Sequence, residues 1–353
     1  MSRNNIASRF NHATRPRAKR VFKKAFSIHK VGNLFLNSLS KKVSDFKKTP
    51  SAWGLPPAIM IEAASVCNLY CPLCACGAGE VHRKTPFLDV HRFEALINEL
   101  QKSLWMVLFW NQGEPFLHPS LHAMIRYASD RGIYTITSTN GHFLQDADAL
   151  IESNLDEVIV SLDGATEDVY QKYRVGGNFQ KVLEGISMLV QQRHNKNVNH
   201  PHITIQCVIS RYNEHQVHAL EELSQSLGVD ELLFKTMEII PGAKETDYLP
   251  RNLRYRRYPE NPETWTRKND KKNCRELWYQ PGLNSDGTVS VCCFDKNAVF
   301  NPGEYIPGNF RALWKSPKWM SIRDRVKNKK GDIMPCKKCT ATLNLNYRSI
   351  LFQ

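Results

Sequence analysis

CNLYCPLC, residues 67–74, is the stretch that decides the fold of this chain. Its cysteines, Cys67, Cys71 and Cys74, have the spacing C-x3-C-x2-C and follow an apolar run at 58–61 that is typical of a β-strand. Thiolates are ligands that iron–sulfur clusters prefer. Three of them in one short loop can bind three irons of a cubane and leave the fourth open to another molecule. This arrangement indicates catalysis rather than electron storage.

Beyond this loop, strand-like and helix-like patterns alternate along the chain. Six β/α repeats in about 180 residues predict a parallel sheet with crossover helices, too few to close an eight-stranded barrel. The fold class is therefore α/β, an open partial barrel whose chemistry lies at the carboxyl ends of the strands. Strands are expected at 58–63, 104–110, 133–138, 156–161, 202–209 and 230–236, and helices at 89–102, 119–131, 146–153, 178–193 and 213–227.

Polar motifs with glycine follow three consecutive predicted strands. They read NQGEP at 111–115, STNG at 138–141 and SLDG at 161–164. Each alone is also ordinary turn chemistry, since Asn-Gly and Asp-Gly are favoured in turns. Their recurrence at successive strand ends, after a three-cysteine loop at the first, indicates one shared site.

Together these motifs resemble those of the radical S-adenosylmethionine (SAM) enzymes over about residues 55–235. The resemblance implies a partial (β/α)6 TIM-type barrel, a site-differentiated [4Fe–4S] cluster on the three catalytic cysteines, and bound SAM. It places Tyr70 beside the cluster and the backbone of Gly113 with the Glu114 carboxylate at the SAM amino group. The remaining SAM contacts that it implies are Ser138, Asn140, Ser161, Asp163 and, for the SAM carboxylate, Arg174.

A second group of cysteines lies near the C-terminal end of the sequence. Cys274 precedes a hairpin with Asp-Gly at its turn (286–287), then Cys292 and Cys293 follow, and Cys336 and Cys339 form a C-x2-C pair. The pattern resembles SPASM and twitch auxiliary-cluster modules, small α+β domains. It implies one auxiliary [4Fe–4S] cluster on Cys274, Cys292, Cys336 and Cys339. Strand alternation points Cys292 and Cys293 opposite ways, and the G-x4-C spacing from residue 287 favours Cys292.

Zinc is the alternative at both cysteine groups. Cys76 could complete a four-ligand zinc site with the loop at 67–74, and the four C-terminal cysteines could hold structural zinc. Cys207, in the middle of a predicted strand, is expected to be a buried structural thiol. Lys235 and Glu238, near the end of the sixth predicted strand, either point into the site or have helix-cap or surface roles.

The charge of the chain is unevenly distributed. Residues 1–48 carry a net charge of +12 and the remainder only +2, so the body gives no specific nucleic-acid signal. We expect disorder over 1–20, followed by two amphipathic helices divided at 32–33. These helices either pack on the exterior of the barrel or rest on an anionic membrane surface. No apolar run approaches a membrane span, and no signal peptide is evident.

These features predict four segments: a basic, partly helical extension (1–50), a radical SAM core (51–238), a linker or substrate-covering segment (239–273) and an auxiliary-cluster domain (274–353). The predicted function is reductive cleavage of SAM to a 5′-deoxyadenosyl radical, which abstracts hydrogen from a small sugar- or polyol-like metabolite. Maturation of a ribosomal peptide and non-catalytic electron transfer are the alternatives. A flavodoxin or ferredoxin is the expected reductant. The expected location is the cytoplasm, where contact with the membrane surface through residues 1–48 is the further option.

Overall fold

The computed structural model describes residues 15–47, 49–239, 246–258, 261, 264–266, 274–329, 332–341, 343 and 345–352. Residues 1–14, and much of the expected covering segment at 239–273, lie outside the described residues.

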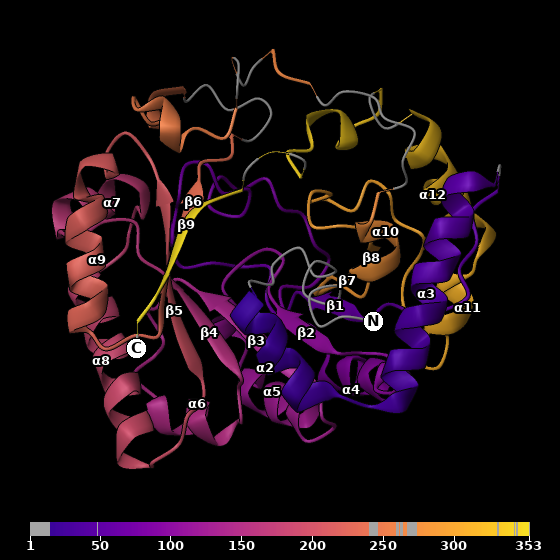
Figure 1. Ribbon diagram of the computed structural model, residues 1–353, viewed down its shortest axis with the longest axis horizontal. Helices are drawn as coiled ribbons and strands as arrows, with labels where there is room; N and C mark the ends of the chain where they lie inside the picture. The colour runs from indigo at the N-terminus through magenta and orange to yellow at the C-terminus, as the bar shows by residue number, and fades with distance from the viewer. Residues whose placement is uncertain are drawn as a thin grey trace.

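One curved sheet of nine strands forms the centre of the molecule, in the order β8-β7-β1-β2-β3-β4-β5-β6-β9 (Figure 1). Strands β1 to β6 are parallel neighbours in chain order, as predicted for a partial barrel. Their Val- and Ile-rich sequences suit a sheet covered on both faces. The strands are β1 (Ala58–Ile61), β2 (Met106–Phe109), β3 (Tyr134–Thr139), β4 (Glu157–Ser161), β5 (His202–Ile209), β6 (Glu231–Thr236), β7 (Gly282–Leu283), β8 (Val289–Ser290) and β9 (Asn346–Leu351).

Crossover helices follow the strands and cover the outside of the sheet (Figure 1). The helix α7 (Glu167–Tyr173), directly after the SLDG motif, is an addition to the predicted set. The other core helices are α4 (Val90–Leu100), α5 (Leu121–Ser129), α6 (Ala147–Glu152), α8 (Phe179–Asn195) and α9 (Val217–Ser226), and the C-terminal region adds α10 (Glu276–Tyr279), α11 (Phe310–Trp314) and α12 (Pro317–Lys329).

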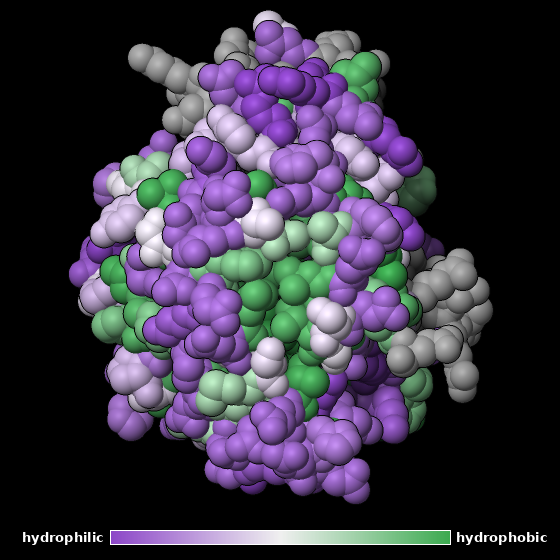
Figure 2. Space-filling view, turned by 90° about the vertical axis from the view of Figure 1, so that its left-hand side faces the viewer, coloured by the Kyte–Doolittle hydropathy of each residue, from purple (hydrophilic) through white to green (hydrophobic). Residues whose placement is uncertain are grey.

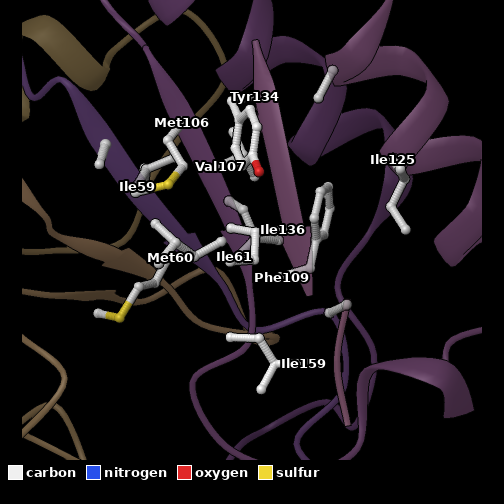
Figure 3. Packing of buried hydrophobic residues seen from close by; sticks show 14 of the residues in the cluster. Ile59, Met60, Ile61, Met106, Val107, Phe109, Ile125, Tyr134, Ile136 and Ile159 are labelled. Carbon is white, nitrogen blue, oxygen red and sulfur yellow. The ribbon is translucent and has the colours of Figure 1, made fainter. Parts of the chain in front are cut away.

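Apolar side chains of the first strands form the core between the sheet and its helices. Ile59, Val107 and Ile136 come from three neighbouring strands and are fully buried (Figure 3). Burying a side chain of this size contributes about 1.5–3 kcal/mol. The resulting rigid sheet holds the strand ends, and the loops on them, in fixed positions.

The sheet extends beyond the six predicted strands at both edges. The hairpin expected around residues 286–287 is formed by β7 and β8, and β7 pairs in parallel with β1. At the other edge β9 lies antiparallel to β6. The region after Cys274 is therefore joined to the barrel through the sheet rather than only through a linker.

The N-terminal extension differs from its prediction in two ways. Residues 15–20, expected to be disordered, belong to helix α2 (Arg15–Ala25), and the helix break falls at 26–27 instead of 32–33. Helix α2 lies across the amino-terminal ends of β3 and β4 (Figure 1), where Arg17 and Arg20 both pair with Glu157. These cations neutralise buried acidic groups, so part of the basic extension is an internal component of the barrel.

Helix α3 (Ile28–Phe46) packs on the C-terminal region. Asn37 donates a hydrogen bond to the carbonyl of Trp278 at 2.5 Å, and the hydroxyls of Ser38 and Tyr279 are 2.8 Å apart. Among the described helices, none is long and apolar enough to cross a membrane. Figure 2 shows the face on the α7–α9 side, which is mostly polar around a hollow of apolar residues.

Candidate functional site

The three-cysteine loop lies directly after β1, in a small apolar cluster with Leu69 and Tyr173. Burial raises the pKa of the Cys71 thiol to about 11, although the nearby Arg174 guanidinium acts in the opposite direction. Iron must therefore displace protons from these thiols as it binds. The Cys67 thiol is only partly buried; this burial raises its pKa, and the charges of Glu114 and Cys74 add to the effect.

Arg174 connects the loop to the end of β4. Its Nη1 lies 3.9 Å from the sulfur of Cys71, and its Nε donates to Asp163 at 2.5 Å. The other Asp163 oxygen accepts from the backbone N–H of Val208 at 2.6 Å. The fully buried Asp163 carboxylate is therefore occupied in holding Arg174 beside the cysteine loop.

The GEP motif packs onto the backbone of the cysteine loop. Gly113 has φ of +71°, and an added Cβ would lie 2.4 Å from the carbonyl of Ala64, so only glycine fits. Glu114 is buried, and its carboxylate accepts from Thr139 Oγ1 and from the N–H of Asn140, both at 2.7 Å. Burial raises the pKa of Glu114 to about 7. The carboxylate thus links the second and third strand ends.

Asn140 is oriented by a histidine two residues later. His142 Nε2 accepts from the N–H of Asn178 at 2.8 Å, so Nδ1 carries the hydrogen and donates to Asn140 Oδ1 at 3.0 Å. This leaves the Asn140 amide N–H groups facing Asn68 Oδ1 at 2.7 Å and the sulfur of Cys67 at 3.8 Å. Hydrogen bonds to cluster sulfurs tune reduction potential. Sequence reasoning missed His142.

Two adjoining cavities occupy the carboxyl-terminal side of the barrel. The outer cavity, of roughly 370 Å³, is lined by Cys71, Cys74, Gly113 and Arg174. The inner cavity, of roughly 280 Å³, reaches Ser138 and the Arg17 guanidinium of α2. Both are lined by Asn111, Gln206, Lys235, Glu238, Arg257 and Lys296. The shared lining makes them one polar lumen between the cysteine loop and the C-terminal region.

Six of the eight predicted cofactor contacts do not line the outer cavity, and three of these, Glu114, Asn140 and Asp163, are buried in the hydrogen bonds described above. Tyr70 is 66% exposed and lines neither cavity, whereas Leu73, directly before the third cysteine, is buried and lines the outer one. Ser138 faces the inner cavity only, and Ser161 is buried outside the lining of both. The structure thus brings Arg174 and Gly113, but not these six residues, to the cavity beside the cysteine loop.

The C-terminal cysteines lie close enough to influence one another. Burial raises the pKa of Cys292, and the charges of Cys293, Cys274 and Cys339 add to that effect, while Cys339 also acts on Cys293. Cys293 lines the inner cavity. Cys336 and Cys339 are joined by a backbone hydrogen bond of 3.1 Å in a short helical turn.

A buried ion pair that sequence reasoning missed connects the two regions. Glu62, directly after β1, accepts from Arg83 at 2.7 and 3.1 Å and from Asn111 at 3.3 Å. Arg83 also donates to the carbonyl of Lys296 at 2.7 Å. An acid directly after a buried strand is the only sequence signal for this pair.

The side chains present fit the implied cofactors. The outer cavity combines cysteine thiols, a glycine that permits close approach, and two buried polar atoms, Asn111 Oδ1 and Gln112 Nε2, that have no partner in the described part of the chain. Within that part, no three His, Cys, Asp or Glu side chains form a group that fits one metal ion.

Comparison with known proteins agrees with this geometry. The model of the radical SAM superfamily matches residues 61–223, and that of an iron–sulfur cluster-binding SPASM domain matches 274–340. An AdoMet-dependent heme synthase of Methanosarcina barkeri is 27% identical over 49% of this chain and 48% of its own. A PqqA peptide cyclase of Bradyrhizobium diazoefficiens is 24% identical over 53% of this chain and 48% of its own. The chain spans about half the length of these curated relatives.

Solved structures share the fold at low sequence identity. SuiB of Streptococcus suis bound to its precursor peptide SuiA has a TM-score of 0.61 at 14% identity, covering 83% of this chain and 71% of that one. SuiB bound to SAM has a TM-score of 0.59 at 15% identity, over 80% and 72% of the two chains. Family models, fold and cysteine pattern agree, and the two domains imply a [4Fe–4S] cluster, SAM and an auxiliary iron–sulfur cluster. The chain belongs to the radical SAM superfamily and carries a C-terminal SPASM-type iron–sulfur cluster-binding domain.

Proposed function

We propose that this chain is an enzyme that reductively cleaves SAM and abstracts a hydrogen atom from a substrate in the lumen. The observation that carries the proposal is the outer cavity, where Cys71, Cys74 and Arg174 share one wall. When bound, the reduced cluster and SAM supply a 5′-deoxyadenosyl radical. Arg174, held by Asp163, is suited to pair with the SAM carboxylate, because a guanidinium matches a carboxylate bidentately.

The protein's own contribution is to orient and enclose the reactants. The sheet and α2 close the inner end of the lumen, and Cys293, Phe294 and Lys296 of the SPASM region form part of its wall. Such enclosure limits the access of water to a reactive intermediate. A flavodoxin or ferredoxin is the proposed electron donor.

For the substrate we propose a small polar metabolite, of which sugars and polyols are one class. The lumen is of small-molecule size, and Asn111, Gln206 and Glu238 offer hydrogen-bonding groups along it. A peptide that inserts one side chain is the second candidate. It is favoured by the PqqA peptide cyclases among the relatives and by the likeness to SuiB, whose structure contains a precursor peptide.

Deuterium transfer tests both the activity and the substrate class. The reduced enzyme is mixed with SAM and an extract of cells grown in deuterated medium, and 5′-deoxyadenosine is analysed by mass spectrometry. Deuterium in 5′-deoxyadenosine is expected, because the abstracted atom comes from the extract. Loss of the label after protease treatment would identify a peptide, and its persistence in the fraction below about 1 kDa a metabolite. Failure of the reduced enzyme to form any 5′-deoxyadenosine would refute the proposed activity.

Iron analysis of variants tests the auxiliary ligands. With one cluster in each domain, the wild type is expected to contain about eight irons per chain. Cys292→Ala should lower this to about four, because Cys274 and Cys339 both act on Cys292, whereas of these two only Cys339 is among the charges that act on Cys293. Cys293→Ala, the matched control, should keep about eight. The reverse result would identify Cys293 as the ligand. A content of about four irons in the wild type would contradict the presence of an auxiliary cluster.

For α3 we propose contact with an anionic membrane surface from the cytoplasmic side. Ile28, Phe35 and Phe46 are 78%, 52% and 91% exposed and recur on one helical face near lysines. Replacing these three by serine is expected to abolish pelleting with phosphatidylserine vesicles. The matched control replaces Leu253, Val299 and Ile306, which are 72%, 72% and 62% exposed elsewhere. Equal pelleting of both triple variants would contradict the proposed contact.

A further inference from the structure

The cations that line the lumen are mostly neutralised by protein groups. Arg17 is paired with Glu157, and Arg174 with Asp163. Arg257 lies 3.3 Å from Glu238 and also donates to the carbonyl of Thr236 at 2.7 Å. The charges of these three arginines are therefore already compensated within the protein.

Two lysines that line the same lumen, Lys235 and Lys296, are not neutralised in this way. Within the part of the chain that the structure describes, neither the Lys235 nor the Lys296 ammonium has a hydrogen-bond or ion-pair partner, and both line the outer and the inner cavity. Lys235 projects inward because inward and outward positions alternate along β6, where Leu233 also lines the inner cavity. Lys296 is held in place by the bond from Arg83 to its carbonyl.

Burial of the charged Lys235 ammonium in the lumen costs free energy. Burial, together with the charges of Arg257 and Arg17, lowers the pKa of Lys235 to about 8 against the opposing influence of Cys293 and Glu238. An unpaired charge removed from water is destabilising unless an opposite charge joins it. A bound anion would supply that charge.

We propose that Lys235 and Lys296 together bind an anionic group of the substrate, a carboxylate or a phosphate. The inference rests on the proposed function and adds the substrate class: a molecule that carries an oxyanion at the end away from its reacting carbon. Anchored at the shared part of the lumen, such a molecule extends toward Cys71 and Cys74, where the outer cavity ends. The SAM carboxylate has its own cation in Arg174, which lines only the outer cavity.

Calorimetric titration of the anaerobically reconstituted, SAM-bound full chain with inorganic phosphate, and separately with acetate, tests this site at pH 7. The wild type is expected to bind at least one of the two anions, and the tighter one identifies the substrate group. Lys235→Met and Lys296→Met should each weaken binding at least about tenfold, because each removes one of two charges. Lys296→Arg, which keeps the charge, should retain binding. Lys102→Met, at an exposed lysine remote from the lumen, is the matched control.

Each result decides the proposal. Absence of anion binding by the wild type overturns it. Anion binding by both Met variants that is as tight as that of the wild type, with unchanged iron content, also overturns it. A parallel fall in SAM affinity in both variants, measured by equilibrium dialysis, also overturns it, since the lysines would then hold the SAM carboxylate. Failure to form 5′-deoxyadenosine would refute the proposed function but would not affect the measurement of anion binding. The failure of the proposed function and the failure of the anion site can therefore be distinguished.

Discussion

Replacing Cys71 by alanine is expected to abolish 5′-deoxyadenosine formation and to lower the iron content from about eight to about four per chain. The thiol lies in the centre of the three-cysteine loop, lines the outer cavity and has Arg174 Nη1 at 3.9 Å. A loop with two thiolates cannot hold a three-ligand cluster, so the electron that cleaves SAM has no route to it. The measurements are iron and sulfide analysis, and chromatography of the nucleoside after dithionite reduction.

Cys76 provides the matched control within the same loop. Its sulfur donates to the carbonyl of Ser65 at 3.4 Å, and burial raises its pKa to about 12, which suits a thiol that stays protonated. Cys76→Ala is expected to keep about eight irons and the wild-type rate of 5′-deoxyadenosine formation. Equal iron loss in both variants would instead make Cys76 a ligand and restore the four-cysteine alternative.

Much of the core architecture could be predicted from local sequence. The six strands of the partial barrel were expected within a few residues of their observed limits, because apolar runs and turn residues report local structure directly. The motifs at the strand ends follow from that alternation, since parallel strands end at one edge of the sheet. This is why Gly113, Asn140 and Asp163 converge from three separate loops.

Long-range pairing is what the local pattern cannot reveal. The strand β9 pairs with β6 across more than a hundred residues, and β7 joins the edge beside β1. Arg17 and Arg20 were interpreted as part of a solvated basic tail, because their partner Glu157 is remote in sequence. The orientation of Tyr70 is likewise set by packing, with its ring beside Gly176.

The second large effect is expected at the inner end of the lumen, where Arg17→Met should destabilise the protein by about 3 kcal/mol. Arg17 is 2% exposed and Glu157 is fully buried. Removing the arginine leaves a buried carboxylate that keeps the more exposed Arg20 as its ion-pair partner and the Tyr134 hydroxyl as a hydrogen-bond donor. The measurement is the urea midpoint of the anaerobically prepared, iron-loaded chain, together with faster amide exchange in α2.

A second variant separates lost charge pairing from lost packing. In Arg17→Met combined with Glu157→Gln, the buried carboxylate is gone and the part-exposed Arg20 is left without this counter-charge, so part of the stability should return, and a double-mutant cycle measures that coupling. Lys24→Met removes the same kind of pair in the same helix, but Lys24 is 31% exposed, so a cost of at most about 1 kcal/mol is expected. Equal destabilisation by Lys24→Met and Arg17→Met would show that burial of the pair is not what matters.

The pH dependence of stability gives the same pair an independent signature. Burial alone would raise the pKa of Glu157, but Arg17 and Arg20 outweigh it and lower the pKa from 4.5 to about 2. Because the folded-state pKa is depressed, this contribution is fully present above pH 4.5 and is lost as the pH falls from 4.5 toward 2. In Arg17→Met the depression should shrink, so the stability lost between pH 4.5 and 2 should be smaller than in the wild type. Identical acid profiles for the two proteins would mean that Arg20 alone holds Glu157 ionised, and that Arg17 is available to whatever occupies the inner cavity.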